Sequence, residues 1–339
     1  MLHTAQRVAL IGGGFIGQVH AANLAAHPQA TLSLVCDTDT ARADALAQRY
    51  ASQTASIEQA LNSEAIDAVL IASSTPTHAD LLERAVIAGK AVYCEKPIDL
   101  SLPRARDVVE KLTPLKVPVT VGFNRRFDQS HQQLKQQLKQ GIIGAPALIQ
   151  MVCRASEMPP LSYLQASGGQ MRDQAIHFFD LLRFLTGDEV VKVGALGAAL
   201  ALPEIRAFGD VDTSVLIMQL QRGALAQLDN TRRTAYGYDE RISILGSQGM
   251  LASEPQAVRG ATLYQGEKIT QPGLFPDWFN RVRDTYFAHL DAFLRHIGGE
   301  EVDDLPDLYD GLQAQAIAEA ACESLASGQF SDVERIAAA

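Results

Sequence analysis

A carboxylate and an imidazole are spaced for joint chemistry at Asp173 and His177. The two residues are four positions apart in a segment with helical periodicity, so we expect both on one face of a helix, with Asp180 just beyond. A carboxylate beside an imidazole can fix its tautomer and raise its basicity, and an imidazole with a pKa of about 6.5 suits proton abstraction from an alcohol at neutral pH. The alternative interpretation is an acid favoured by the helix N-terminus and an unrelated core histidine.

A lysine stands where it could assist that chemistry. The apolar run 91–94 predicts a buried strand, and Glu95, Lys96 and Pro97 follow it directly. Ligands of open parallel sheets lie beyond the carboxyl ends of the strands, so we expect the following proline to hold Lys96 over the site. Removal of a hydride from a secondary alcohol requires a base for the hydroxyl proton and a cation near the developing oxyanion. His177 and Lys96 would supply both. We expect no metal, because no third ligand is evident at helical or loop spacing.

The elements that would position these groups begin with a strand, a turn, a helix and a second strand between residues 8 and 37. Gly12, Gly14 and Gly17 follow the first strand in the spacing of a dinucleotide-binding turn. Gly12 would allow a sharp turn, Gly14 a close approach of the backbone to a pyrophosphate, and Gly17 tight packing of the helix on the strand. The alternative is another doubly wound unit, such as a flavodoxin-like one, with an incidental glycine-rich turn.

An acid ends the second strand of this unit. Asp37 lies twenty positions after Gly17, where a dinucleotide site needs an acceptor for the ribose hydroxyls. Because a carboxylate repels a 2′-phosphate, we expect NAD rather than NADP, while the nearby Arg42 leaves dual use open. The loop after the strand 68–72 should line the nicotinamide side, and His78 there is interpreted as a helix-entry residue rather than a catalytic one. The predicted cofactor-binding residues are Gly12, Gly14, Phe15, Ile16, Gly17, Asp37, Thr38, Arg42, Ser73, Thr75, His78, Glu95 and Lys96.

Composition indicates a globular chain of two domains. It has 339 residues, of which 47% are hydrophobic, and a formal net charge of −10. This acidic balance argues against nucleic acid as a partner, because phosphate backbones require clustered lysine and arginine. The apolar run near the N-terminus is interrupted by glycines, so we expect no signal peptide, no membrane span and a cytoplasmic location. The four cysteines are scattered, with no C-x-x-C pair and no spacing suited to zinc, and are interpreted as reduced thiols.

The order of the predicted elements indicates an α/β protein. A doubly wound, Rossmann-type parallel sheet is expected over 1–123, where the helix after Asp37 should have a Thr40 cap. A second, α+β domain with a mostly antiparallel sheet is expected over 124–339. Its predicted strands are 147–153, 190–200, 213–220, 225–231, 241–245 and 250–253. Its predicted helices are 130–140, 173–185, 279–297 and 305–327, the last packing back on the first domain, and 155–169 is expected to be a loop near the site.

Several motifs together resemble the glucose–fructose oxidoreductase/inositol dehydrogenase/rhizopine-catabolism family over nearly the whole chain. The motifs that carry this resemblance are Gly12 to Gly17 with His20, Glu95-Lys96-Pro97, and Gly168-Gly169 followed by Asp173 and His177. Three further segments look like the inositol 2-dehydrogenase branch of the family, namely 122–128, Arg232-Arg233 and 236–239.

The resemblance implies NAD-dependent oxidation of a secondary hydroxyl of myo-inositol, or of a related cyclic polyol, to the ketone. It also implies a large open sheet in the second domain and a homo-oligomer, either a dimer or a tetramer. Lys96, Asp173 and His177 would be the catalytic residues. The implied substrate-binding residues are Lys96, Arg126, Arg154, Asp173, Gln174, His177, Tyr236 and Tyr238.

Two positions depart from the pattern of the family. The resemblance leads us to expect an acid or amide after Arg154 and an acid after His177, but the chain has Ala155 and Phe178. Loss of polar groups from a pocket that binds hydroxyls changes discrimination strongly, so a dehydrogenase of another cyclitol, a pyranose or an anhydrosugar is an alternative. A dinucleotide-sensing regulator without turnover is a second alternative, against which the intact set of catalytic residue types argues.

Overall fold

The computed structural model describes residues 5–336, which form two compact units. The first unit contains the chain up to Phe127 and the segment Asp284–Gln315, and the second contains Asp128–Arg283 and Ala316–Arg335. A continuous second domain was expected after position 123. In the structure the chain instead returns to the first unit before it re-enters the second.

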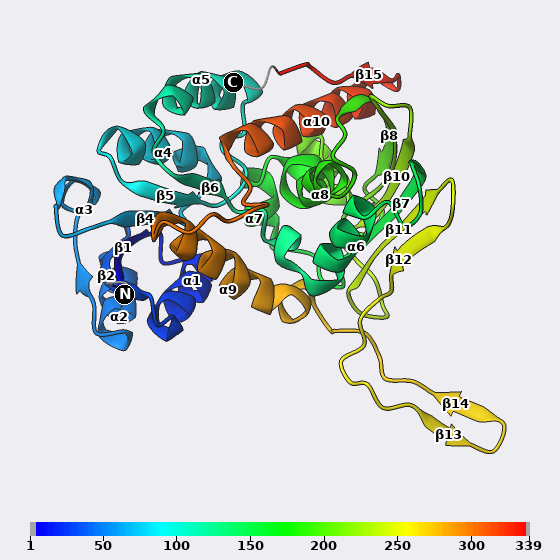
Figure 1. The fold of residues 1–339 in the computed structure, drawn as a ribbon, viewed down its shortest axis with the longest axis horizontal. Coiled ribbons are helices and arrows are strands. Elements are labelled where there is room, and N and C mark those ends of the chain that lie inside the picture. The colour runs from blue at the N-terminus through cyan, green and yellow to red at the C-terminus, as the bar shows by residue number, and fades with distance from the viewer. Residues whose placement is uncertain (1–4, 337–339) are drawn as a thin grey trace. The chain divides into compact units, whose positions relative to one another are not determined.

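The first unit is built on a six-stranded sheet in which every neighbouring pair of strands is parallel (Figure 1). Its central strands are short runs of buried apolar residues, as expected for a parallel sheet covered on both faces. From edge to edge the strands are β3 (Gln53–Thr54), β2 (Ala30–Cys36), β1 (Gln6–Ile11), β4 (Ala68–Ile71), β5 (Ala91–Cys94) and β6 (Val119–Val121). This order is that of a Rossmann fold, so the predicted doubly wound sheet is confirmed.

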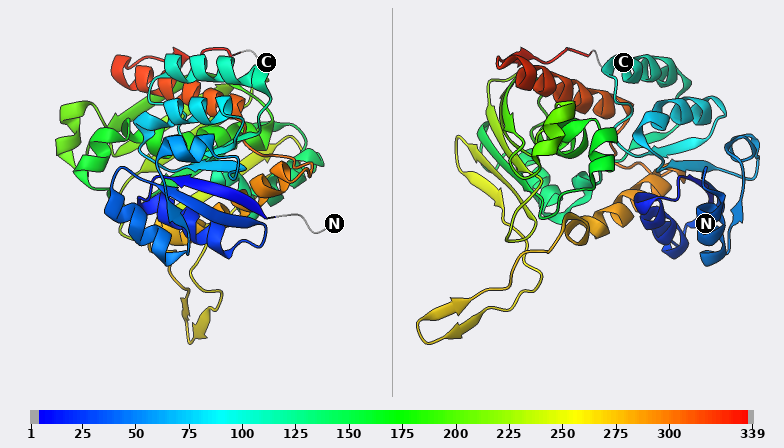
Figure 2. Two further views of the ribbon diagram at one scale, coloured as in Figure 1. Left: turned by 90° about the vertical axis from the view of Figure 1, so that its left-hand side faces the viewer. Right: turned by 180° about the vertical axis from the view of Figure 1, so that it is seen from behind.

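Helices cover both faces of this sheet. Its helices are α1 (Phe15–Ala26), α2 (Thr40–Arg49), α3 (Ile57–Asn62), α4 (His78–Ile87), α5 (Leu102–Leu112) and the part of α9 (Trp278–Ile297) from Asp284 onward. Side chains of α1, α2 and α9 share one apolar cluster with the strands, and Figure 2 shows α4 and α5 on the opposite side of the sheet. The N-cap of α2 is Asp39, whose side chain accepts the N–H of Arg42 at 3.1 Å, so the prediction of Thr40 as the cap was wrong by one residue.

The second unit is built on a seven-stranded mixed sheet. Its strands, in spatial order, are β12 (Met250–Ser253), β11 (Asp239–Gly246), β7 (Pro146–Arg154), β10 (Leu225–Thr231), β9 (Thr213–Leu220), β8 (Val190–Ala198) and β15 (Ser331–Asp332). Neighbours are antiparallel except β7 and β10, so the predicted, mostly antiparallel sheet is observed. The edge strand β15 and the hairpin β13 (Leu263–Gln265) and β14 (Lys268–Thr270), which extends away from the sheet in Figure 1, were not predicted.

The helices of the second unit lie on one face of its sheet (Figure 1). They include α6 (Gln129–Lys139), α7 (Leu161–Ala166), α8 (Ile176–Thr186) and the later part of α10 (Leu308–Ser327). Helix α7 interrupts the segment expected to be a loop. A π-helical turn, Met171–Ala175, leads directly into α8. Turns of this kind are rare and occur frequently at functional sites, which directs attention to the start of this helix.

No helix between residues 5 and 336 is long and apolar enough to cross a membrane. The same residues contain no cluster of three or more histidine, cysteine or carboxylate side chains arranged to hold a metal ion. Cys36 and Cys94 end buried strands, as expected, and burial raises the pKa of both thiols, that of Cys36 to about 11.

Candidate active site

The glycine-rich turn after β1 is closely packed at its first and last glycines. Gly12 has a φ of +99°, and a Cβ there would lie 2.6 Å from the backbone of Ala72. A Cβ on Gly17 would lie 1.9 Å from the carbonyl oxygen of Gly12. The left-handed φ of Gly12 agrees with the sharp turn predicted there, and the close approach at Gly17 agrees with the predicted tight packing of α1 on the strand.

Gly14 lies in a different environment within the same turn. It is the N-cap of α1 with a φ of −64°, and no other atom lies within 4 Å of the position that a Cβ would take. The unpaired N–H groups of the first turn of a helix favour a phosphate at such a place. The turn thus leaves open space where a dinucleotide-binding fold would hold a pyrophosphate, so the residues fit NAD.

Asp37 is fixed beside this turn. Its Oδ2 accepts the N–H of Gly13 at 2.7 Å, and its Oδ1 accepts that of Asp39 at 2.8 Å. Desolvation acts to raise the pKa of Asp37, but these two hydrogen bonds and the charge of Arg42 outweigh it and leave the pKa below its usual value. Nη1 of Arg42 lies 3.5 Å from the carboxylate, so a charged acceptor and a guanidinium stand side by side at the end of β2.

The predicted cofactor-binding residues beyond β4 and β5 lie in two connected loops. His78 begins α4, and its buried ring joins the loops, with Nδ1 2.8 Å from the carbonyl oxygen of Pro97 and Nε2 3.1 Å from that of Ser73. Burial lowers the pKa of His78, which agrees with its interpretation as a helix-entry residue. Glu95 is also buried, and its Oε1 lies 2.8 Å from Nε2 of His20. Lys96, the next residue in the chain, is half-buried.

Asp173 and His177 share the exposed side of their helix. Both side chains are partly exposed, whereas the neighbouring Ile176, Phe178 and Phe179 are buried. The two residues therefore lie on one face, as their spacing predicted, although Asp173 is in the π-helical turn rather than in α8 itself. Asp180, the residue predicted just beyond, is completely buried.

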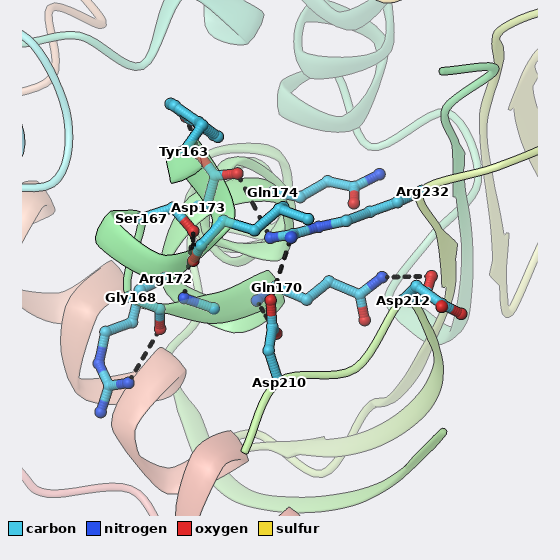
Figure 3. Close-up of polar contacts among 12 residues, drawn as sticks. Tyr163, Ser167, Gly168, Gln170, Arg172, Asp173, Gln174, Asp210, Asp212 and Arg232 are labelled. Atoms are coloured by element: carbon cyan, nitrogen blue, oxygen red, sulfur yellow. Dashed lines mark hydrogen bonds and ion pairs between the residues drawn. The ribbon is translucent and has the colours of Figure 1, made fainter. Parts of the chain in front are cut away.

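The carboxylate of Asp173 is held by donors from two separate segments (Figure 3). The hydroxyl of Tyr163, on α7, donates to Oδ1 at 2.8 Å. Nη2 of Arg232, one residue after β10, lies 3.4 Å from Oδ2. Tyr163 was not among the predicted site residues, and Arg232 was singled out only for its resemblance to the family. An arginine pair at the end of an alternating strand was the one local signal available for Arg232.

Two glutamines anchor the π-helical turn to the sheet. The amide nitrogen of Gln174 lies 3.0 Å from the carbonyl oxygen of Thr231 and 3.4 Å from Sγ of Cys153. The side chain of Gln170 bonds the carbonyl oxygen of Asp212 at 2.9 Å and the hydroxyl of Ser214 at 2.8 Å. Gln174, a predicted substrate-binding residue, is thus tied to β7 and β10 and fixes the turn that carries Asp173.

Arg154 and Tyr236 form a second polar cluster on the exposed face of the sheet. Arg154 bonds the carboxylate of Asp229 and the hydroxyl of Tyr236, the latter at 3.0 Å. Tyr236 in turn donates to Asp239 at 2.8 Å. Because side chains alternate along a strand, Arg154 lies on the opposite face from the neighbouring Cys153, which packs under Gln174.

Tyr238 and Arg126 are buried. Tyr238 is 3% exposed and donates to Glu240 at 2.8 Å on the helix-covered face of the sheet. Arg126 belongs to the first unit, is 4% exposed, and lies 2.9 Å from Asp310. Both side chains therefore also serve the core of their own unit.

The two departures from the family pattern differ in their surroundings. Phe178 is 1% exposed in the core behind the exposed side of its helix, so an acid there would be buried. Ala155 directly follows β7 and donates its N–H to the carbonyl oxygen of Thr231 at 2.8 Å, near the anchor of Gln174. The second departure alone therefore lies near groups that could bind a hydroxyl.

Known proteins resemble this chain over both of its units. Residues 6–123 match the oxidoreductase family with an NAD-binding Rossmann fold, and residues 131–252 match the GFO/IDH/MocA C-terminal domain. The chain is 39% identical over 321 residues to the inositol 2-dehydrogenase of Rhizobium meliloti (strain 1021), an alignment that covers 94% of this chain and 97% of that protein.

Solved structures show the same likeness over the whole chain. A myo-inositol dehydrogenase from Corynebacterium glutamicum matches with a TM-score of 0.91 and 33% identity, covering 98% of this chain and 100% of that one. A scyllo-inositol dehydrogenase from Lactobacillus casei, solved with bound NAD(H) and scyllo-inositol, matches with a TM-score of 0.86 and 28% identity, covering 97% and 99%. The resemblance read from the motifs is confirmed. The chain belongs to the GFO/IDH/MocA family and is an NAD-dependent oxidoreductase whose first unit is the NAD-binding domain.

Proposed function

We propose that this protein oxidises one secondary hydroxyl of myo-inositol, or of a related cyclic polyol, to the ketone with NAD. The observation that carries the proposal is the placement of Asp173, held by two donors at the start of the helix whose exposed side also presents His177. The names of the relatives support the substrate class, because they include dehydrogenases of myo-inositol and of scyllo-inositol.

Each polar group has one role in the proposed reaction. His177 accepts the hydroxyl proton, Asp173 orients its imidazole, and Lys96 stabilises the developing alkoxide oxygen. NAD, when bound, accepts the hydride. The turn around Gly14 holds the pyrophosphate, and Asp37 accepts hydrogen bonds from the ribose hydroxyls. Gln174, next to Asp173 in the π-helical turn, is the candidate to bind another hydroxyl of the polyol. Arg126, Arg154, Tyr236 and Tyr238 stay candidates only through the resemblance to the family, because Arg154 and Tyr236 lie on the opposite face of the sheet from Gln174 and the other two are buried.

The stereochemistry of the polyol is the part of the proposal with the most alternatives. Because Phe178 is a core residue, its difference from the family pattern removes no polar group from the exposed side of α8. Ala155 does remove one near Gln174, so another cyclitol, a pyranose or an anhydrosugar stays an alternative substrate.

The proposal includes a homo-oligomer, dimer or tetramer, in the cytoplasm. The helix-free face of the seven-stranded sheet exposes a row of apolar side chains that would be covered by another copy of this chain. These side chains are Leu148, Val215, Ile217, Leu225 and Leu245, each 39–54% exposed. No disulfide joins the four cysteines, which suits a reducing compartment. Sedimentation velocity would show a single species of monomer mass if the oligomer proposal is wrong.

Spectrophotometry of NADH formation tests the reaction directly. The purified protein is assayed with NAD or NADP against myo-inositol, scyllo-inositol, D-chiro-inositol, glucose and levoglucosan. We expect turnover with NAD and an inositol. Turnover with glucose or levoglucosan alone would keep the mechanism and change the substrate. Intact NAD binding without turnover on any member of the panel would contradict the proposal and favour a sensor.

A further inference from the structure

Arg232 is a buried guanidinium that lies between two carboxylates (Figure 3). Its side chain is 2% exposed, with Nη1 3.1 Å from Oδ2 of Asp210 and Nη2 3.4 Å from Oδ2 of Asp173. The side chain of Asp210 is 4% exposed and that of Asp173 is 14% exposed. Arg232 therefore connects the buried carboxylate of Asp210 to the more exposed carboxylate of Asp173 in the candidate site.

The segment before β9 is built around this anchor. The carboxylate of Asp210 accepts the backbone N–H groups of Gln170 and Val211, both at 2.8 Å. The carbonyl oxygen of Asp212 accepts the backbone N–H of Arg232 at 2.8 Å and the side-chain amide of Gln170 at 2.9 Å. One short segment thus fixes the backbone and the head group of Arg232, together with the residue that precedes the π-helical turn.

The opposite oxygen of Asp173 is held by Tyr163, so the carboxylate is oriented from two sides. Each carboxylate oxygen can accept two hydrogen bonds, and these donors leave capacity for an imidazole. Orientation matters at this position because Asp173 lies in the π-helical turn, whose i→i+5 bonding shifts the register of its side chains relative to those of α8.

Fold stability alone is a weak explanation for this arrangement. Burial of a guanidinium costs free energy, and apolar residues in place of a buried ion pair are often neutral or stabilising. Within residues 5–336, Nε of Arg232 has no hydrogen-bond partner, so its desolvation is incompletely compensated. We infer that Arg232 and Asp210 are positioning residues, which hold Asp173 in the orientation that His177 requires. This inference rests on the proposed roles of Asp173 and His177.

The test compares Arg232→Gln, Arg232→Lys and Asp210→Asn with a matched control. The control is Arg172→Gln, because Arg172 lies in the same π-helical turn and bonds Glu319 and the carbonyl oxygen of Gly168, while its side chain points away from Asp173 (Figure 3). The measurements are kcat with myo-inositol, or with the substrate that the panel identifies, the Kd for NAD, and the melting temperature. A role limited to stability would lower the melting temperature without a selective loss of kcat.

We expect Arg232→Gln to lower kcat about 100-fold, with the Kd for NAD within about twofold of the wild-type value. Arg232→Lys keeps the charge without the planar fork and should recover about tenfold of that loss, and Asp210→Asn should cost about tenfold. Arg172→Gln should stay within about threefold. Wild-type kcat in folded Arg232→Gln, or an equal loss in Arg172→Gln, would overturn the inference. If Arg232→Gln does not fold, wild-type kcat in the Lys and Asn variants would do the same.

Failure of the proposed function gives a different result. In that case the wild-type protein binds NAD but turns over no polyol, and crystal structures of wild type and Arg232→Lys decide the positioning role. A changed rotamer of Asp173, with loss of the Tyr163 hydrogen bond, would support the inference. An unchanged Asp173 would overturn it.

Discussion

The carboxylate of Asp37 accepts the backbone N–H of Gly13 at 2.7 Å, which ties the glycine-rich turn to the end of β2. The same side chain is only 6% exposed and is also held by the N–H of Asp39. The orientation of the Asp37 carboxylate is therefore set before a cofactor binds, so binding of the ribose costs little conformational entropy at this side chain.

Replacement of Asp37 should weaken NAD binding without a matching loss in the chemical step. We expect Asp37→Ala to raise the KM for NAD about tenfold or more, with kcat changed less than about threefold, because the ribose contact is remote from the reacting carbon. The preference for NAD over NADP should also narrow, since Arg42 stays in place without the opposing carboxylate. Initial rates with NAD and with NADP measure both the KM for NAD and the cofactor preference. An unchanged KM for NAD would show that the ribose is held elsewhere.

Gly14 and Gly17 should respond differently to the same added methyl group. Gly14→Ala meets open space and an ordinary φ, so it should fold with a wild-type melting temperature but bind NAD about tenfold or more weakly. Gly17→Ala would put its Cβ 1.9 Å from the carbonyl oxygen of Gly12 and should fold poorly. Calorimetry of folding and of NAD binding separates the two effects. Wild-type NAD affinity in Gly14→Ala would contradict the predicted path of the pyrophosphate.

Loss of the proposed base should remove turnover and spare the cofactor. We expect His177→Ala to lower kcat by about 100-fold to 10,000-fold, the usual range for a general base, while the Kd for NAD stays within about twofold. His296→Ala is the matched control, because His296 is exposed at the end of α9. Equal losses of kcat and of NAD affinity in His177→Ala would exclude His177 as the base.

The first unit should lose stability as the pH falls below neutrality. His289 is completely buried, with Nε2 2.9 Å from the hydroxyl of Thr120 and Nδ1 2.8 Å from that of Tyr93. Thr120 gives its proton to the carbonyl oxygen of Pro306, so Nε2 of His289 donates and Nδ1 accepts from Tyr93. Desolvation, and secondarily the charges of His20 and Arg126, lower the pKa of His289 well below its usual value, in agreement with a neutral ring.

The lowered pKa of His289 determines how the free energy of unfolding changes with pH. A histidine with a depressed pKa in the folded state contributes stability that is complete above the unfolded pKa of about 6.5 and is lost as the pH falls toward the folded value. The free energy of unfolding should decrease by up to about 1.4 kcal/mol for each pH unit below that point. Urea unfolding between pH 8 and pH 5 measures it. His289→Gln should have a shallower slope, and a slope equal to that of the wild type would exclude His289 as the source.

Elements with a strong local signal were predictable from the sequence. The strands β4 and β5 are runs of four buried apolar residues, and such a run between turn residues has few other solutions. The shared exposed side of Asp173 and His177 was predictable for the same kind of reason, because the core residues beside them have helical spacing.

Contacts that join distant segments had no such signal. Arg232 and Asp173 are 59 positions apart, and charged residues near strand ends are usually solvated, so nothing local marked Arg232 as buried. The residues of the π-helical turn follow the same apolar pattern as those of an α-helix, so this pattern predicted a helix but not its π-helical start. The apolar face of α9 predicted a buried helix but carried no information about which sheet it covers, and its contribution to the core of the first unit was therefore missed.

The return of the chain to its first unit limits which fragments of the protein can fold on their own. Leu290, Phe293 and Leu294 of α9 complete the core beneath β1 and β2, so a fragment that stops at residue 127 would leave that apolar surface in water. The NAD-binding domain is therefore not a segment that one cut can release. Transplanting it into another protein requires Asp284–Gln315 as well. Exchange of the second unit between relatives likewise requires both Asp128–Arg283 and Ala316–Arg335, so it cannot be made as a fusion at one end.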